Sequence, residues 1–241
     1  SSAFLNVNIN NNVINNCGSG IYYKTINPKN SDGSRPNTYT CQGKSYAPTI
    51  DTASSICGNT ITVVDTADTS SKQFPYGIRL YGENLTANDG IVLAGDYSAQ
   101  NVNVSSNNIT ISRGANAIWL VGTKNINVSQ NTVLFNNSAY STKDNVFGLR
   151  LENSTNATIN ANTINANNIP YVQNVIILDK SKGVNIAGNT LTGAKKHGIN
   201  LTSSSASISA NTISGNKENG IFCYKNSTMT TNKNRITGNK K

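Results

Sequence analysis

Residues 184–201, VNIAGNTLTGAKKHGINL, are followed at residues 206–224 by a second version of the same pattern, ASISANTISGNKENGIFCY. Each version contains an apolar–polar–Ile triplet, an Asn-Thr pair followed by Leu or Ile, a short polar loop, and a segment that begins with Gly-Ile. Asn189 and Asn211, which begin the two Asn-Thr pairs, are 22 residues apart. A fixed period of this size is typical of a solenoid, in which each repeat forms one coil.

The repeat predicts strands rather than helices. Gly-Ile-Asn-Leu at residues 198–201 alternates with period two, as a half-buried strand does. No window places apolar residues at helical spacing over several turns. We therefore predict an all-β fold, a right-handed parallel β-helix with about three short strands per coil.

The asparagine of the repeat recurs along nearly the whole chain, at Asn12, Asn59, Asn107, Asn131, Asn162, Asn189, Asn211 and Asn234. The intervals are 47, 48, 24, 31, 27, 22 and 23 residues. We expect each of the two long intervals to hold two coils with insertions, which gives roughly 8–10 coils in all. Gly90-Ile-Val-Leu is expected to form one of the additional strands.

These asparagines predict a ladder inside the solenoid. Parallel strands of successive coils lie ~4.8 Å apart, so that equivalent side chains form columns. Buried amides are tolerated when they are hydrogen-bonded, and a column of inward asparagines can pass amide hydrogen bonds from coil to coil. We predict that the corner residues form an Asn ladder of this kind.

The chain is expected to form a single domain over residues 1–241. A solenoid is one stack of neighbouring coils, and no linker rich in proline or charge interrupts the pattern. The exception is a loop-rich insertion at about residues 24–56, which breaks the period and carries Pro28, Pro36 and Pro48.

The charge balance suggests an acidic partner. Twenty Lys and Arg stand against 11 Asp and Glu, for a net charge of +9, which favours uronate polysaccharide, sulfated glycan, teichoic acid or nucleic acid. Nucleic acid is disfavoured because no basic cluster is interleaved with aromatic residues. Membrane insertion is not expected, because no apolar run approaches the ~20 residues that span a bilayer.

The four cysteines suggest an extracellular protein. Cys223 occupies an inward strand position and is expected to be a buried free thiol. One disulfide among Cys17, Cys41 and Cys57 is plausible, and Cys41–Cys57 closes the smallest loop. We expect no metal site and no cofactor, because no C-x-x-C pair is present and the chain has a single histidine.

The candidate site lies on the outward face of the Gly-Ile strands, where Ile and Leu point inward and the residue between them points outward. Trp119 and Arg150 are expected to be neighbours on this face. Aromatic rings offer sugars an apolar surface, and arginine pairs with carboxylates in a forked geometry. We predict that the ligand-binding residues are Arg79, Tyr81, Trp119, Arg150, Glu152, Asp179, Lys196 and His197.

The repeat and its corner asparagines resemble the pectate-lyase-like right-handed parallel β-helix superfamily. That resemblance implies binding or cleavage of polysaccharides along this kind of face. The motifs of the hydrolases of that superfamily are missing here: Asn-Thr is never followed by Asp, no Asp-Asp pair exists, and Lys196-His197-Gly198 matches only the His-Gly of Gly-His-Gly. The Asp-Pro-His-Glu motif of the epimerases is absent as well.

A polysaccharide lyase remains the alternative enzyme. Pectate lyases use clustered acids for Ca²⁺ and an Arg or Lys base, and Glu152, Asp179 and Arg150 are expected to be adjacent. A salt bridge between Glu152 and Arg150 explains the same residues without catalysis. Ca²⁺ is implied only under this alternative.

Two other classes are less consistent with the sequence. A column of threonines after the ladder asparagines would suit an ice-binding surface, but the coil lengths are irregular, and Asn108 and Arg235 interrupt the column. Phage tail fibres also use β-helices but usually form trimers with large apolar outer faces, and the sequence shows none.

We therefore expect a non-catalytic carbohydrate-binding module of an adhesin, secreted or displayed on a bacterial cell surface. A basic, Asn-rich solenoid without the catalytic motifs resembles the ligand-binding regions of serine-rich repeat adhesins. This resemblance implies binding of pectin-like or mucin-type glycans from a plant or host. The module is expected to be a monomeric part of a larger protein.

Overall fold

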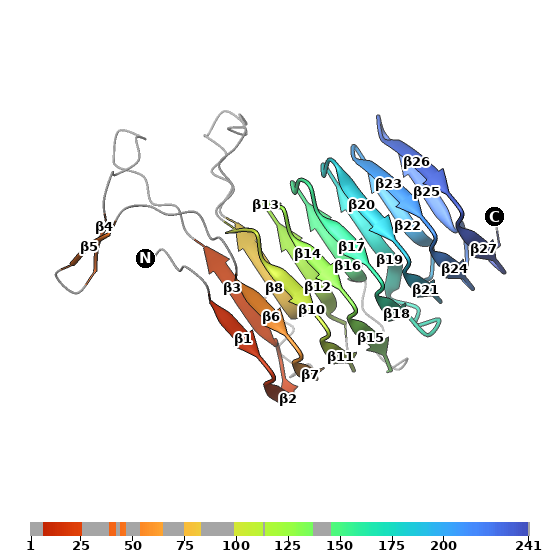
Figure 1. Cartoon of the computed structure of the whole chain (residues 1–241). Helices are drawn as coiled ribbons and strands as arrows, with labels where there is room; N and C mark the ends of the chain where they lie inside the picture. The colour runs from red at the N-terminus through yellow and green to blue at the C-terminus, as the bar shows by residue number, and fades with distance from the viewer. Residues whose placement is uncertain are drawn as a thin grey trace.

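The computed structural model describes residues 7–25, 39–41, 44–46, 54–64, 75–82, 99–112, 114–136 and 146–240. Within these ranges the regular elements are all strands. Figure 1 shows most of them stacked in chain order, from β1 (Asn8–Asn10) and β2 (Val13–Cys17) at the N-terminal side to β26 (Thr228–Asn232) and β27 (Arg235–Thr237) at the C-terminal side. The all-β prediction is confirmed.

Three long parallel sheets, here called A, B and C, form the walls of the solenoid. Sheet A has eight strands: β1 (Asn8–Asn10), β6 (Ser55–Cys57), β10 (Asn103–Ser105), β14 (Asn127–Ser129), β17 (Thr158–Asn160), β20 (Val184–Ala187), β23 (Ser205–Ser209) and β26 (Thr228–Asn232). Sheet B also has eight: β2 (Val13–Cys17), β7 (Thr60–Val63), β11 (Asn108–Ile111), β15 (Thr132–Phe135), β18 (Thr163–Asn165), β21 (Thr190–Thr192), β24 (Thr212–Ser214) and β27 (Arg235–Thr237).

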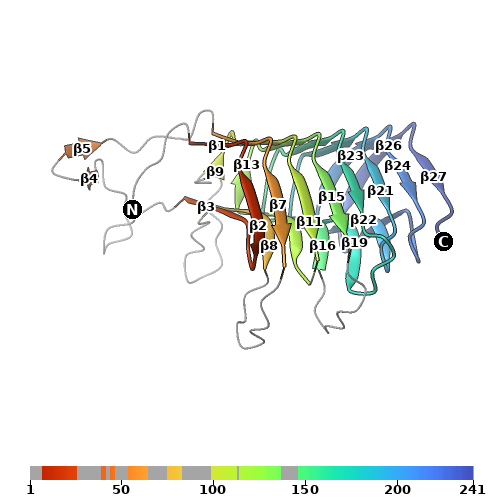
Figure 2. The ribbon, with the colours of Figure 1, turned by 90° about the horizontal axis from the view of Figure 1, so that it is seen from below.

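Sheet C has seven strands: β3 (Ile21–Thr25), β8 (Tyr76–Gly82), β12 (Asn116–Val121), β16 (Val146–Glu152), β19 (Val172–Asp179), β22 (His197–Thr202) and β25 (Ile221–Tyr224). Two smaller sheets accompany the walls. One pairs β9 (Ala99–Gln100) with β13 (Thr123–Lys124), and the other is an antiparallel hairpin of β4 (Tyr39–Cys41) and β5 (Lys44–Tyr46). Figure 2 shows the strands of sheet B side by side along the stack.

The core is a narrow column of aliphatic side chains from the three walls. In sheet B the inward residues Ile61, Ile109, Val133, Ile164, Leu191 and Ile213 are aligned in register from strand to strand and fully or almost fully buried. Sheet C contributes a matching column that includes Leu80, Leu120, Leu151, Leu178 and Leu201. Period-two alternation therefore sets which side chains are buried, as the sequence predicted.

The Asn ladder is present with all eight predicted residues. Each side-chain Nδ2 donates to the Oδ1 of the ladder asparagine in the next coil, over 2.8–3.0 Å from Asn12 to Asn234. The same Oδ1 also accepts the backbone N–H of the preceding ladder residue, as Asn162 does for Asn131 at 3.0 Å. In the middle of the stack the amides are buried and fully engaged, which satisfies the polar groups of this corner.

A second, hydroxyl ladder runs along another corner and was not predicted. The backbone N–H groups of Ser154, Ser181 and Ser204 donate to the Oγ of the serine in the following coil at 3.0–3.2 Å. Thr123 extends the series by donating both its N–H and its hydroxyl to Ser154 Oγ. Two corners of the solenoid are thus held by side-chain hydrogen bonds that run along its axis.

The two long intervals were interpreted wrongly. Asn12 bonds directly to Asn59, and Asn59 bonds directly to Asn107, so that each interval is a single coil with insertions. Likewise, β8 pairs directly with β12, and no strand that contains Gly90 lies between them in sheet C. Gly90-Ile-Val-Leu itself lies outside the described residues. The eight strands of sheets A and B fall at the lower limit of the predicted number of coils.

The expected insertion near residues 24–56 corresponds to the interval between β3, which ends at Thr25, and β6, which begins at Ser55. The hairpin β4–β5 belongs to this interval. The prediction of one domain over residues 1–241 stays a prediction.

Candidate binding face on sheet C

The outward side of sheet C carries two aligned columns of side chains. The first contains Tyr22, Arg79, Trp119, Arg150, Ile177, Asn200 and Phe222. The second contains Tyr81, Val121, Glu152, Asp179, Thr202 and Tyr224. The predicted adjacency of Trp119 and Arg150, and of Glu152 and Asp179, is confirmed.

Arg79 is the centre of an aromatic cluster. Its guanidinium carbon lies 4.1 Å from the centroid of the Trp119 ring and 5.4 Å from that of Tyr22. Tyr76 and Tyr81 place their ring centroids 5.8 and 5.2 Å from the same carbon. A cation within about 6 Å of an aromatic ring is attracted by the electron-rich ring face, so the four rings hold the guanidinium group on this face.

Arg150 continues the stack on the other side of Trp119. Its guanidinium carbon lies 5.3 Å from the Trp119 ring centroid and 5.1 Å from that of Phe147. Arg150 also forms a salt bridge with Glu152. The charge of Arg150 is therefore balanced within the face, whereas no carboxylate of the described residues pairs with Arg79.

Several polar atoms of this face have no hydrogen-bond partner among the described residues. They are Nε of Arg79, Nε1 of Trp119, Nε of Arg150 and Oδ1 of Asn200. Buried polar groups are normally satisfied, so a cluster of unsatisfied ones along one column is an unusual feature of this wall.

Trp119 differs from the prediction in its packing. The sequence predicted an outward-pointing ring that offers its apolar surface to sugars. In the structure the ring is half-buried, and the guanidinium groups of Arg79 and Arg150 stack against it. The cause is the register, which places an arginine in the strand on either side. The surface offered to a ligand is therefore a composite of guanidinium and aromatic groups.

The remaining predicted residues, Lys196 and His197, lie apart from Arg79 and Trp119, at the start of β22. Lys196 is exposed, but His197 is buried and stacks on Phe222 with a centroid distance of 4.5 Å. The His197 Nδ1 accepts the backbone N–H of Asn219 at 3.3 Å, and its Nε2 lies 3.5 Å from a carboxylate oxygen of Glu218. This arrangement gives His197 a packing role between β22 and β25.

Burial lowers the pKa of His197, with Glu218 opposing this effect and Lys196 adding to it. The unfolded chain therefore takes up a proton at His197 at a higher pH than the folded chain does. We expect the free energy of unfolding to fall as the pH drops from about 7.5 to about 5.5, through the ordinary histidine pKa of ~6.5. Urea unfolding at the two pH values measures this fall.

His197→Asn is the matched variant for this prediction, because the chain has a single histidine. In this variant the free energy of unfolding should no longer fall as the pH drops from about 7.5 to about 5.5. An equally steep fall in the variant would show that another group is responsible.

Three aromatic residues that contact Arg79 or Arg150 were not among the predicted ligand-binding residues: Tyr22, Tyr76 and Phe147. Tyr76 and Phe147 each stand three residues before the arginine that they contact. The signal was present, because YGIRL at residues 76–80 and FGLRL at residues 147–151 share one aromatic–Gly–aliphatic–Arg–Leu pattern.

The predicted Cys41–Cys57 disulfide is not formed. Cys57 is a free thiol on the outward side of β6, and its Sγ lies 3.1 Å from Ser105 Oγ in the neighbouring strand. The side chain of Cys41 lies outside the described residues. Cys17 is also a free thiol, and burial raises its pKa. Cys223 is a free thiol aligned with Leu201, as predicted, although it is only partly buried.

Neither a membrane helix nor a metal cluster is found in the described part of the chain. None of its segments is a helix long and apolar enough to cross a bilayer. No three or more His, Cys, Asp or Glu side chains gather in these residues in a way that could hold a metal ion.

The solved structures that are similar to this chain include two forms of a bacteriophage tailspike protein. Full-length tailspike protein 2 of an Escherichia coli O157:H7 bacteriophage is 14% identical, with 97% of this chain and 35% of that chain covered and a TM-score of 0.44. The enzymatically active domain of a bacteriophage tailspike protein 2 is 11% identical, with 96% and 42% covered and a TM-score of 0.33. The chain thus spans well under half the length of either.

No curated protein sequence matches the chain. Residues 89–241, which are more than half of it, match the family described as "Right handed beta helix region". This match agrees with the parallel walls and the Asn ladder of the structure, and the chain therefore belongs to the right-handed β-helix family.

Proposed function

We propose that the outward side of sheet C is a non-catalytic binding surface for an anionic polysaccharide of the pectin or mucin type. The observation that carries this proposal is the Arg79 cluster, in which a cation without a carboxylate partner among the described residues is held against four aromatic rings. Guanidinium groups recognise carboxylates and sulfates through paired N–H donors, and the surrounding rings suit the apolar C–H groups of sugars.

The geometry of the face suits a polymer. The two columns run along the axis of the solenoid from Tyr22 to Tyr224, both of which are exposed. Positions in a column repeat every ~4.8 Å, so that an extended chain lying along the axis would contact several coils. The net charge of +9 adds long-range attraction for a polyanion.

We also propose what kind of protein carries this surface and where it acts. A binding surface of this kind fits an adhesin module that is secreted or displayed on a bacterial cell surface, and we expect it to act as a monomeric part of a larger protein. No cofactor is required for such binding.

The proposal is tested by a pull-down on immobilised polygalacturonate and on mucin at about 50 and about 500 mM salt. We expect retention at low salt and strong loss at high salt, because exposed ionic contacts are screened as the Debye length shrinks. Retention that does not depend on salt, or no retention on either polymer, would contradict the proposal.

A polysaccharide lyase is the second candidate. Glu152 and Asp179 are neighbouring outward carboxylates, and Arg150 lies beside them, which is the arrangement that favours this activity. Incubation with polygalacturonate and Ca²⁺, followed by ultraviolet absorbance of unsaturated products, separates the two candidates. Steady product formation that is lost in Arg150→Ala would favour the lyase.

A further inference from the structure

The outward side of sheet B, here called the sheet B face, is a regular array of short side chains. Its first column consists of Thr60, Asn108, Thr132, Thr163, Thr190 and Thr212. Its second column consists of Thr62, Thr110, Leu134, Asn165, Thr192 and Ser214. Five residues of the first column and three of the second are threonine, and none of either column is charged over the six strands from β7 to β24.

The Asn ladder holds the first column in place. Each residue of this column directly follows a ladder asparagine, as Thr190 follows Asn189. The backbone N–H of Thr190 donates to the carbonyl of Asn162 at 2.8 Å, and Asn162 Nδ2 donates to Asn189 Oδ1 at 3.0 Å. Threonine is also β-branched and therefore stiff about its first side-chain torsion. The methyl and hydroxyl groups of the column are thus held at a fixed spacing from coil to coil.

The hydroxyl groups of the sheet B face are largely unused within the described part of the protein. Among the threonines of the two columns, only Thr192 has a side-chain hydrogen bond to a described residue, at 3.2 Å from Asn165 Oδ1. Sheet A differs, because its outward polar side chains bond to one another. Asn127 Nδ2, for example, donates to Asn103 Oδ1 at 2.8 Å and to Ser129 Oγ at 3.1 Å. Only the sheet B face therefore presents a row of open hydroxyl groups to water.

The spacing of the sheet B face is regular in two directions. From β7 to β27 each strand pairs with the next without a shift of register. Equivalent residues of neighbouring strands lie ~4.8 Å apart, and alternate residues of one strand lie ~6.6 Å apart. The unequal coil lengths, which in the sequence disfavour an ice-binding surface, therefore do not disturb this wall. Asn108 interrupts the column of hydroxyls with another short polar side chain.

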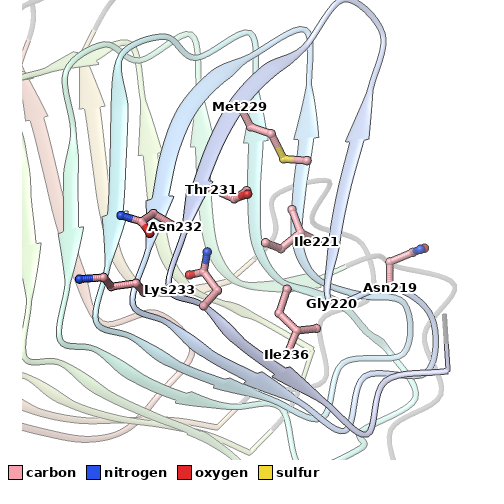
Figure 3. A pocket seen from close by; sticks show the side chains of 9 residues that line it. Asn219, Gly220, Ile221, Met229, Thr231, Asn232, Lys233 and Ile236 are labelled. Carbon is pink, nitrogen blue, oxygen red and sulfur yellow. The ribbon is translucent and has the colours of Figure 1, made fainter.

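Among the described strands from β7 onward, charge enters the outward side of sheet B only at β27. Ile236 lies with Ile221 and Met229 around a hollow of ≈ 540 Å³ (Figure 3), so its neighbours Arg235 and Thr237 point outward. Arg235 is aligned with Thr212 and is exposed. This interruption of the threonine column thus lies beyond the six uncharged strands.

The composition of the sheet B face disfavours other partners. An anionic polymer would find no cation among the outward residues from β7 to β24. Aromatic rings suit the apolar faces of sugars, and the two columns contain none. Large apolar patches mark protein interfaces, but Leu134 is the one large apolar side chain of the two columns. What remains is a rigid, uncharged array of hydroxyl and methyl groups.

From this geometry we infer that the sheet B face binds ice. The surface of an ice crystal repeats its oxygen atoms at fixed intervals in two directions, and the sheet B face repeats its hydroxyl groups in the same manner. Because the side chains are ordered before contact, little conformational freedom is lost on binding. Each contact is weak, so binding depends on all six strands acting together. This function uses another wall of the solenoid than the proposed function of sheet C and does not depend on it.

Ice itself is the probe in the test. A dilute solution of the protein is frozen slowly, and the protein taken into the ice is compared with that left in the liquid. The thermal hysteresis, which is the gap between the melting and freezing points of a single ice crystal, is measured over a range of protein concentrations. We expect enrichment in the ice and a hysteresis that rises with concentration. Exclusion of the protein from the ice, or absence of hysteresis, would overturn the inference.

Thr190→Lys and Asn185→Lys are matched variants. Both side chains are exposed and belong to the same coil, but Thr190 lies between Thr163 and Thr212 on the sheet B face, whereas Asn185 points outward from sheet A. We expect Thr190→Lys to lower the amount of protein in the ice at least about tenfold, as the loss of a central contact does. A lysine there places a long, strongly hydrated ammonium group between the ice and the neighbouring threonines.

Asn185→Lys should keep the ice affinity, and equal losses in the two variants would overturn the inference. Urea unfolding should give the same midpoint for both variants, because each substitution is on the surface. Thr163→Lys, in the neighbouring coil, should repeat the loss seen with Thr190→Lys. A Thr163→Lys variant that folds and keeps full ice affinity would also contradict ice binding by this wall.

Two further results would assign the sheet B face to another occupant and overturn the inference. One is retention on crystalline cellulose that Thr190→Lys abolishes, and the other is a dimer in sedimentation that the same substitution abolishes. Arg79→Ala should leave the hysteresis unchanged, because Arg79 lies on sheet C. Loss of hysteresis in Arg79→Ala would place the ice contact on sheet C instead. Failure of ice binding and failure of polysaccharide binding are therefore distinguishable.

Discussion

Asn162→Ala is expected to lower the free energy of unfolding by about 3–6 kcal/mol, because each buried donor left without an acceptor costs about 1–3 kcal/mol. Asn162 Oδ1 accepts both the N–H and the Nδ2 of Asn131, and its own Nδ2 donates to Asn189 and to the carbonyl of Val128. Alanine removes all four bonds at once. Urea unfolding measures the change.

Thr163→Ala is the matched control. Thr163 follows Asn162 directly but points outward from sheet B and is exposed. Replacing Thr163 by alanine should change the free energy of unfolding by no more than about 0.5 kcal/mol. A cost below about 1 kcal/mol for Asn162→Ala would show that the ladder is not a main stabilising element of the solenoid.

Arg79→Ala is expected to lower the affinity for polygalacturonate about ten- to a hundredfold, because a hydrogen bond to a charged group contributes about 1.5–3 kcal/mol. Arg79 is the cation around which Trp119 and three tyrosines gather. Its removal takes away a positive charge that no carboxylate of the described residues pairs with, and with it the packing between two strands. Calorimetric titration at low salt gives the affinities.

Arg235→Ala separates this local effect from the loss of charge alone. Arg235 is exposed at the end of sheet B, and its replacement changes the net charge by the same amount. We expect the affinity to fall by less than about threefold, the share due to long-range attraction. Equal losses in the two variants would mean that binding follows net charge and does not use sheet C.

Much of the fold could be predicted because each coil repeats the same physical requirement. An inward Asn between two apolar residues recurs where the corner needs an amide, and this placement identified all eight ladder residues. The hydroxyl ladder was missed although Ser154, Ser181, Ser204 and Ser227 keep the spacing of the coils. Serine is so common on the surface of this chain that the spacing alone did not distinguish these residues.

The errors arose where the length of a segment was taken as evidence of structure. The intervals from Asn12 to Asn59 and from Asn59 to Asn107 are long enough for two coils, yet the hydrogen bonds of the ladder show one in each. Insertions in a solenoid leave the stack without disturbing its register, so their length does not report the number of coils. The Cys41–Cys57 prediction also relied on sequence distance and ignored the outward direction of Cys57.

The candidate site could be predicted in its register but not in its packing. Period-two alternation places Trp119 beside Arg79 and Arg150, because the pairing of strands in one wall is regular. The packing of these side chains on one another depends on their rotamers. It also depends on residues near the starts of the strands, such as Tyr76 and Phe147. For the same reason His197 was predicted as a ligand contact, whereas the Phe222 ring and Glu218 enclose it.

The most direct test of the binding face uses Trp119, which is the chain's single tryptophan. Tryptophan emission is followed while polygalacturonate is added at low salt, and binding is measured in parallel by calorimetry. We expect a saturable change in emission at the calorimetric midpoint, shifted to higher polymer concentration in Arg79→Ala. Binding that is clear by calorimetry but leaves the emission of Trp119 unchanged would place the ligand elsewhere and contradict the proposed role of sheet C.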